Sequence, residues 1–143
     1  MSSVGSEREP EFLVVDDNPA HRKQLCRALR TLGKAHELSR GEEVVSALRA
    51  GSFQLVCLDL SLPEISGYEV CRQIRAANLA VKVLAIGERI SVTDRAFARE
   101  VGADDILEKP FRVRELMRRV DALLRGIEPR AKATPFAREV SRD

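Results

Sequence analysis

Short apolar runs alternate along this chain with stretches in which apolar residues recur every three or four positions. The short runs are bounded by turn residues and have the length of strands. The stretches between them have the spacing of amphipathic helices, with an apolar stripe on one side. The weakest run, at 35–38, is typical of an edge strand. The expected strands are residues 11–15, 35–38, 53–58, 81–86 and 105–108.

Capping signals indicate where the helices begin. Asn18 followed by Pro19 combines a favoured N-cap residue with a proline at the first helical position. A serine followed three residues later by an acid, the capping-box pattern, then occurs three times. Apolar residues between Val113 and Leu124 mark the last helix. The three capping-box candidates begin at Ser39, Ser66 and Ser91 and end at Glu42, Glu69 and Asp94.

Five strand–helix pairs in succession favour an α/β fold, with a parallel sheet and helices on both of its faces. The chain of 143 residues has the size of one domain. We expect this domain to span residues 11–125, after a flexible leader at 1–10. Residues 126–143 lose the periodicity and contain two prolines, so we expect a disordered tail there. A separate output domain is therefore not expected in this chain.

Composition narrows the class of protein. Hydrophobic residues make up 44% of the chain, enough for one core, and the net charge of +2 neither favours nor excludes nucleic acid. No run approaches the ~18 apolar residues of a membrane span. The N-terminus has no apolar signal region, so we expect a cytoplasmic protein. The cysteines show no zinc-ligand spacing, and we interpret them as reduced, buried thiols. They are Cys26, Cys57 and Cys71.

Charged residues follow three of the apolar runs at the point where each run ends. Asp16 and Asp17 follow the first run, Asp59 follows the third, and Lys109 follows the fifth. Because the carboxyl ends of parallel strands open onto one crevice, we expect these side chains to converge. With one strand between them, Lys109 starts ~10 Å from Asp59, a gap that an extended lysine can largely cover.

This set of residues suits phosphoryl transfer. Neighbouring carboxylates raise one another's pKa values, so a divalent cation among them is favoured. Mg²⁺ prefers oxygen ligands and is commonly held by carboxylates together with a phosphate. A metal ion and a lysine beside one carboxylate stabilise a transferring phosphoryl group. The acid itself can act as the nucleophile and become an aspartyl phosphate.

Three motifs, in this order and at this spacing, resemble those of response-regulator receiver domains of bacterial two-component signalling. The resemblance covers about residues 11–125 and, without a further domain, indicates the stand-alone, single-domain type. It implies a flavodoxin-like (βα)5 doubly wound parallel sheet with strand order 2-1-3-4-5. The motifs are Val14-Val15-Asp16-Asp17-Asn18, Leu58-Asp59-Leu60-Ser61-Leu62-Pro63-Glu64-Ile65-Ser66-Gly67 and Gly102-Ala103-Asp104-Asp105-Ile106-Leu107-Glu108-Lys109-Pro110-Phe111.

The resemblance implies a role for each site residue. Asp59 would be phosphorylated by a partner histidine kinase or phosphotransfer protein. Asp16 and Asp17 would hold Mg²⁺ together with Asp59 and the main-chain carbonyl of Ser61. Lys109 would contact the phosphoryl oxygens, and its bond to the following proline would be cis, as X-Pro energetics allow. Such a domain is not an enzyme on external substrates, since it catalyses at most its own phosphorylation and dephosphorylation.

Three positions depart from the family pattern. The family usually has Thr or Ser where this chain has Gly87, a small residue where it has Glu88, and an aromatic where it has Ile106. In the family the hydroxyl moves toward the phosphate and the aromatic ring swings inward behind it. Gly87 has no hydroxyl, and the β-branched Ile106 is stiff. Either a main-chain N–H of the loop at Gly87 binds the phosphate instead, or the usual relay is lost. Glu88 would add negative charge beside the phosphate.

Several functional hypotheses stay open. The leading one is a phosphoacceptor that signals by binding another protein, through the fourth helix, fifth strand and fifth helix, or through the first helix. The alternative is a pseudo-receiver that binds its partner regardless of phosphorylation. An aspartate-nucleophile phosphatase would carry an Asp-x-Asp motif after the first strand. A flavin-binding, flavodoxin-like protein would need a phosphate-binding loop at the same place. Neither pattern fits Asp16-Asp17-Asn18-Pro19.

The remaining signals are interpreted as structural. The basic last helix is interpreted as a solvated face suited to protein docking, and neither nucleic acid nor a membrane is expected as a partner. His21 and His36 are interpreted as isolated surface residues, and Phe97 and Phe111 as core. The arginines of the basic helix are Arg112, Arg114, Arg118, Arg119 and Arg125.

Overall fold

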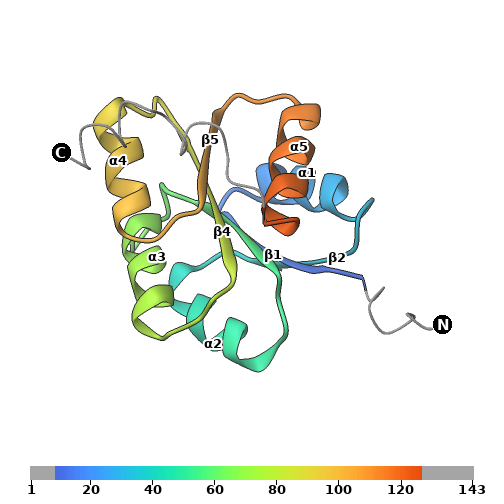
Figure 1. Ribbon diagram of the computed structural model, residues 1–143, viewed down its shortest axis with the longest axis horizontal. Coiled ribbons are helices and arrows are strands. Elements are labelled where there is room, and N and C mark those ends of the chain that lie inside the picture. Colours follow the sequence, from blue (N-terminus) through green and yellow to red (C-terminus); the bar gives the residue numbers. More distant parts are fainter. Residues whose placement is uncertain (1–8, 127–143) are drawn as a thin grey trace.

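Strands and helices alternate along the computed structural model, which describes residues 9–126 (Figure 1). The expected leader and tail lie outside this range except for residues 9, 10 and 126. The strands are β1 (Glu11–Val15), β2 (Lys34–Leu38), β3 (Leu55–Asp59), β4 (Lys82–Glu88) and β5 (Asp105–Lys109). The α-helices are α1 (Pro19–Leu29), α2 (Val44–Ala50), α3 (Gly67–Ala76), α4 (Val92–Glu100) and α5 (Val113–Leu124), and a short 3-10 turn, Gly41–Glu43, precedes α2.

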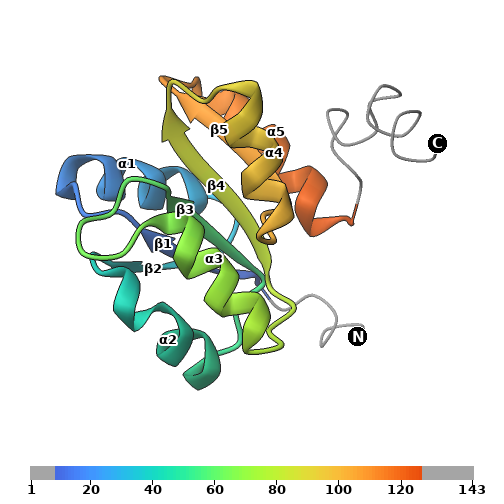
Figure 2. The ribbon, with the colours of Figure 1, turned by 90° about the vertical axis from the view of Figure 1, so that its left-hand side faces the viewer.

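The five strands form one parallel sheet in the order β2-β1-β3-β4-β5. Helices α1 and α5 cover one face, and α2, α3 and α4 cover the other, the side from which Figure 2 is viewed. The predicted doubly wound sheet and its strand order are therefore confirmed. Because β3 lies between β1 and β4, the ends of β1 and β3 are direct neighbours.

Alternating strand residues build the two halves of the core. In β1, Leu13 and Val15 face α2, α3 and α4, whereas Phe12 and Val14 face α1 and α5. This two-residue alternation is that of a strand buried on both sides, so its sequence is continuously apolar. Branched aliphatic residues fill most of both halves, because aromatic residues make up only 4% of the chain. Among the described residues, no helix is both long and apolar enough to cross a bilayer.

The helix starts follow the capping signals in part. The Ser91 hydroxyl accepts a hydrogen bond from the Asp94 N–H, and the Asp94 carboxylate accepts one from the Ser91 N–H, so this capping box is confirmed. Ser66 caps α3 through the Glu69 N–H, but the Glu69 carboxylate pairs with Arg72 instead. The box predicted from Ser39 is wrong. The chain instead forms a 3-10 turn from Gly41, which places Arg40 and not Ser39 at the cap position, and Arg40 makes no side-chain hydrogen bond to the backbone there.

Three further sequence interpretations need correction. Phe97 is interpreted as a core residue from the sequence, yet it is 48% exposed, because the buried side of α4 is formed by Ala98, and its ring contacts Tyr68 with the ring centroids 5.1 Å apart. Phe111 is only half-buried, against the α1 and α5 half of the core. Strand β4 extends two residues beyond the predicted end, so that Gly87 and Glu88 pair with Glu108 and Lys109 instead of forming a loop.

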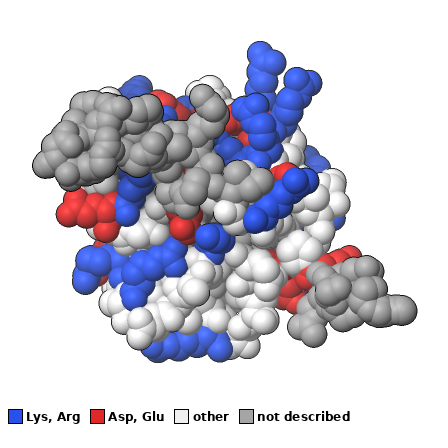
Figure 3. Space-filling model, viewed as in Figure 1, with Lys and Arg blue, Asp and Glu red and all other residues white. Residues whose placement is uncertain are grey.

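The basic last helix is largely neutralised by neighbouring acids. Arg118 and Arg119 pair with Glu115 on the same helix, and Arg119 also reaches the buried Asp105 of β5 at 2.9 Å. On the face seen in Figure 3, Lys and Arg side chains gather around α5, with Asp and Glu between them. A mixed surface of this kind fits the interpretation of a solvated face.

All three cysteines are free and buried, as predicted. Burial raises the pKa of Cys57 to about 12 and that of Cys71 to about 11, and it also raises the pKa of Cys26. Because the thiolate is the reactive form, we expect none of the three to react with an aromatic disulfide reagent at neutral pH in the folded protein. All three should react at once in denaturant. Rapid modification of the native protein would contradict the packing described above.

Candidate functional site

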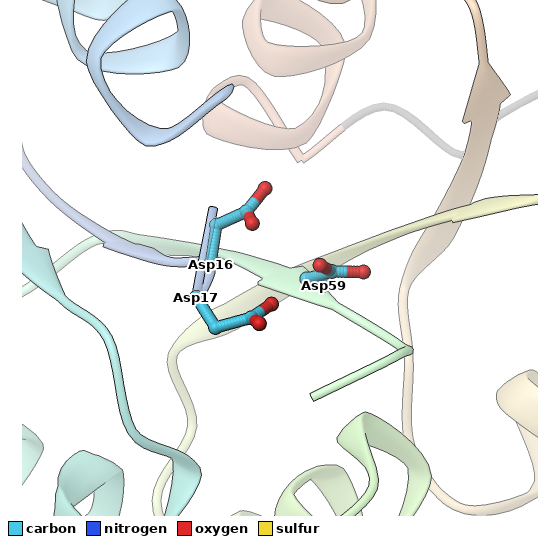
Figure 4. A group of neighbouring side chains, drawn as sticks. All are labelled: Asp16, Asp17 and Asp59. Carbon is cyan, nitrogen blue, oxygen red and sulfur yellow. The ribbon is translucent and has the colours of Figure 1, made fainter. Parts of the chain in front are cut away.

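Three carboxylates meet at the carboxyl ends of β1 and β3 (Figure 4). Asp16 and Asp17 directly follow β1, and Asp59 is the last residue of β3. One oxygen atom from each lies within 4.8 Å of the other two. Asp16 and Asp59 are buried and Asp17 is exposed. The convergence expected from the apolar runs is therefore confirmed, because the two strands that end in acids are neighbours in the sheet.

Backbone N–H groups fix the two buried acids. Asp16 Oδ1 accepts a hydrogen bond from the Asn18 N–H at 2.9 Å, and the Asn18 side chain in turn caps α1 by accepting from Ala20 and His21. Asp59 Oδ1 accepts from the Ser61 N–H at 3.0 Å. Each acid thus uses one oxygen to hold the loop that follows its strand. The second oxygen of each is left for the site.

The free oxygen of Asp16 has no hydrogen-bond partner although it is buried. Its nearest cation is Lys109, whose Nζ lies 3.7 Å from Asp16 Oδ2 and 3.9 Å from Asp59 Oδ2. Both distances exceed those of a hydrogen bond, so the ammonium attracts the carboxylates without satisfying them. An unsatisfied buried carboxylate oxygen is costly and indicates a missing ligand. Oxygen donors of this kind fit Mg²⁺.

The pKa of Asp59 is raised by burial of its carboxyl and, to a lesser extent, by the negative charge of Asp16. The N–H of Ser61 and the ammonium of Lys109 act in the opposite direction and do not restore it. An acid with a raised pKa is less stable in its ionised form inside the fold than in water. The ionised form of Asp59 is therefore electrostatically unfavourable in the folded protein, and a bound cation would reduce this unfavourable energy.

This unfavourable energy gives a testable dependence of stability on pH. Because the folded pKa of Asp59 lies above its unfolded value, ionisation of Asp59 destabilises the fold at neutral pH, and this effect disappears as the pH falls below both values. We expect Asp59→Asn to raise the thermal unfolding midpoint in metal-free buffer at pH 7, and to raise it less at acidic pH. Differential scanning fluorimetry across pH measures this. Asp121→Asn, which changes an exposed acid, is the matched control. Equal effects of the two variants on the unfolding midpoint would show that ionised Asp59 does not destabilise the fold.

Three of the other predicted site residues, Ser61, Glu88 and Lys109, line a cavity of about 210 Å³ together with Asp17 and Asp59. Glu88 therefore lies beside Asp59, as expected from its position. The bond between Lys109 and Pro110 is cis. The role of the Ser61 carbonyl as a metal ligand stays a prediction.

Aliphatic side chains lie close to the point where a side chain at position 87 would begin. A Cβ on Gly87 would lie 2.8 Å from Cδ1 of Ile90 and 3.3 Å from Cδ1 of Leu60. Ile106 is completely buried in the core half formed with α2, α3 and α4. Since Gly87 belongs to β4 and its neighbours occupy the space above it, the loop interpretation of this residue is wrong.

Two residues near the site were missed by sequence reasoning. His21, interpreted as isolated on the surface, is half-buried, and its Nδ1 lies 3.4 Å from Lys109 Nζ. Its signal was its place in the first turn after the Asn18 cap, next to the acids. Glu108 accepts hydrogen bonds from the Ile90 N–H at 3.1 Å and from Arg95 at 3.4 Å. No pattern in the local sequence predicts these hydrogen bonds between β5 and the start of α4.

Comparisons with known proteins agree with this geometry. A family model described as the response regulator receiver domain matches residues 12–121. The response regulator MprA of Mycobacterium tuberculosis is 38% identical over 131 residues, which cover 91% of this chain and 57% of MprA. MprA of Mycolicibacterium vanbaalenii is 40% identical over 119 residues, covering 82% and 52% of the two chains. This chain therefore spans just over half the length of the curated relatives it matches.

Solved structures show the same fold. The Thermotoga maritima response regulator DrrB, an OmpR/PhoB homologue, is 30% identical, with a TM-score of 0.77 over 84% of this chain and 55% of DrrB. The DrrB receiver domain activated by BeF3 is 31% identical, with a TM-score of 0.75, covering 82% of this chain and 98% of that domain.

Proposed function

The chain belongs to the response regulator receiver domains of two-component systems, and from that premise we propose that Asp59 accepts a phosphoryl group from a phosphohistidine, with Mg²⁺ bound. The donor would be a histidine kinase or a phosphotransfer protein. The observation that supports this most directly is the meeting of three carboxylates with one ammonium at the end of β3. The cytoplasmic location expected from the sequence suits such an exchange.

Each residue contributes a defined part of the step. Asp16, Asp17 and Asp59, with the main-chain carbonyl of Ser61, would hold Mg²⁺, which supplies positive charge against the phosphoryl oxygens when bound. An oxygen of Asp59 forms the new bond to phosphorus while the bond from phosphorus to the donor imidazole nitrogen breaks. The imidazole leaves with its electron pair and takes up a proton. Lys109 balances the charge that remains on the phosphoryl oxygens.

The chemistry of this site is confined to the chain itself. Asp59 gains the phosphoryl group and later loses it to water, and no external substrate is turned over. Signalling then occurs by binding another protein, through the face of α4, β5 and α5 or through α1. Neither nucleic acid nor a membrane is part of the proposal.

The output is proposed to work without the usual hydroxyl and aromatic relay. Gly87 offers no hydroxyl, Ile90 and Leu60 fill the space above it, and Ile106 is fixed in the core. The hydrogen bonds of Glu108 offer another route, because Glu108 precedes Lys109 on β5 and holds Ile90 and Arg95. If Lys109 moved toward a phosphoryl group, the adjacent Glu108 would move with it. Through its hydrogen bonds, Glu108 would then shift the start of α4.

We expect Glu108→Ala to weaken this route. Phosphorylation should slow amide hydrogen exchange between residues 88 and 95 in the wild type, and this protection should be largely lost in Glu108→Ala while Asp59 is still phosphorylated. Hydrogen-exchange mass spectrometry measures both. Glu100→Ala, at the exposed end of α4, is the matched control. Unchanged protection in Glu108→Ala would show that the signal takes another path.

A pseudo-receiver is the second candidate, favoured by the packed residues at the switch positions. Such a module would bind its partner with the same affinity whether or not Asp59 carries phosphate. Incubation with a phosphorylated histidine phosphotransfer domain and Mg²⁺ separates the two candidates. Transfer of the label to this chain supports the phosphoacceptor, and its absence with several donors, including a small acyl phosphate, supports the scaffold.

A further inference from the structure

We propose that His21 is a positioning residue, which holds the ammonium group of Lys109 over the phosphoacceptor site. The structural part of this inference concerns the resting protein and stands by itself. Its consequence for the rate of phosphoryl uptake rests on the proposed function. No feature of the three sequence motifs assigns His21 to the site, since it lies in α1 beyond the first motif.

The start of α1 fixes where the imidazole lies. The Asn18 side chain accepts hydrogen bonds from the N–H groups of Ala20 and His21, at 2.9 and 3.1 Å. The Asn18 N–H is itself bonded to Asp16 Oδ1 at 2.9 Å. Cap and acid are therefore one connected unit, which turns the first helical turn toward the carboxylates. His21 lines the cavity above Asp59 as a result.

The nearest polar atom to the ammonium is on the histidine and not on a carboxylate. Lys109 Nζ lies 3.4 Å from His21 Nδ1, compared with 3.7 Å from Asp16 Oδ2 and 3.9 Å from Asp59 Oδ2. An ammonium group has only donors, so this contact is a hydrogen bond in the tautomer whose ring proton is on Nε2 and whose Nδ1 accepts. The ammonium then contacts this nitrogen and also lies near two carboxylates.

The space beside Lys109 explains why such support matters. A second cavity, of about 510 Å³, adjoins the first, and both are lined by His21, Glu88 and Lys109. Glu108 lines this second cavity and not the first, so its carboxylate offers the ammonium an alternative position away from Asp59. A lysine side chain has four rotatable bonds and swings readily when unsupported. The imidazole lines both cavities, and its contact with Lys109 favours the position of the ammonium near Asp59.

Removing the imidazole nitrogen should therefore slow phosphoryl uptake. Loss of one hydrogen bond to a charged group, partly replaced by the carboxylates, corresponds to about a fivefold decrease in rate. Asparagine places an amide oxygen close to the position of Nδ1, whereas leucine keeps the bulk and removes the acceptor. We expect His21→Leu to show the decrease and His21→Asn to restore most of the rate. In a Lys109→Ala background, His21→Leu should add no further decrease.

The resting protein gives a test that needs no phosphorylation. The side-chain ammonium of a lysine gives a resolved nitrogen–proton NMR signal when a hydrogen bond slows its exchange with water. We expect the full chain to show this signal for Lys109, assigned by its absence in Lys109→Arg. It should persist in His21→Asn and be lost in His21→Leu. The matched control is His36→Leu, which removes the other histidine, on β2, where it pairs with Glu11.

These outcomes separate the inference from the proposed function. A Lys109 signal that is absent from the wild type, or unchanged in His21→Leu, overturns the inference whatever happens at Asp59. A signal that behaves as expected in a protein that accepts no phosphate supports the positioning role and refutes the proposed function. Equal decreases in rate for His21→Leu with and without Lys109 would indicate a structural effect on α1 and overturn the positioning role.

Discussion

Asp59→Asn is expected to lower the rate of phosphoryl uptake by at least roughly 10³-fold, because it removes the proposed nucleophile and leaves the rest of the site in place. An amide has almost the same shape as a carboxylate, so the hydrogen bond from the Ser61 N–H to the side-chain oxygen can be kept. The amide oxygen is a poor nucleophile. The measurement is the intact mass after incubation with Mg²⁺ and a small phosphodonor.

The matched control for this experiment is Asp121→Asn, an exposed acid on α5 that lies outside the acidic cluster. It should accept one phosphoryl group at the wild-type rate. Asp16 and Asp17 are close enough to Asp59 to be alternative acceptors. If Asp59→Asn gained phosphate at a rate comparable with the wild type, the nucleophile would have been assigned to the wrong carboxylate.

Gly67→Ala is expected to destabilise the fold by about 3 kcal/mol or more, because its new methyl group would meet backbone and not a movable side chain. A Cβ at this position would lie 2.3 Å from the carbonyl oxygen of Asp59 and 2.6 Å from Cα of Leu60. The Gly67 N–H also donates to the carbonyl of Leu60 at 3.1 Å, which closes the loop after β3. The gain in helix propensity from alanine is at most about 1 kcal/mol and does not offset this clash.

Gly51→Ala provides the contrast. There the Cβ would lie 2.7 Å from a ring atom of Phe53, a side chain that can move, so the cost should stay below about 1 kcal/mol. Urea denaturation gives both free energies of unfolding. Equal stabilities of the two variants would mean that α3 can retreat from the end of β3 without loss, and that this glycine is not what allows the close approach.

The alternation of strands and helices and the acidic strand ends could be predicted because both depend on short-range patterns, whereas the strand order was implied by the resemblance to receiver domains. Each apolar run that ends in an acid defines a strand end, and parallel strands bring these ends to one edge. Asp16 and Asp59 therefore meet as expected. The strand ends themselves were less predictable. Strand β4 continues to Glu88 because pairing with β5 extends past its apolar residues, and pairing partners leave no mark in a local pattern.

Contacts between elements were beyond sequence reasoning. The contact of His21 with Lys109 depends on how α1 rotates against the sheet, and the two residues are 88 positions apart. The filling of the space above Gly87 by Ile90 depends on the path of the loop between β4 and α4. Phe97 has a large apolar side chain, as core residues do, yet the packing of α4 against its neighbours leaves it facing outward. The functional roles of the site residues stay predictions.

The most direct test of the central claim is to locate the phosphate and its dependence on magnesium in one experiment. The chain is incubated with a small phosphodonor, with or without Mg²⁺, and borohydride then converts any aspartyl phosphate into homoserine, which peptide mass spectrometry locates. We predict homoserine at position 59 in the presence of Mg²⁺, and almost none after chelation of the metal. Homoserine at position 16 or 17, or equal modification of Asp59 without magnesium, would contradict a magnesium-dependent phosphoacceptor formed by these carboxylates.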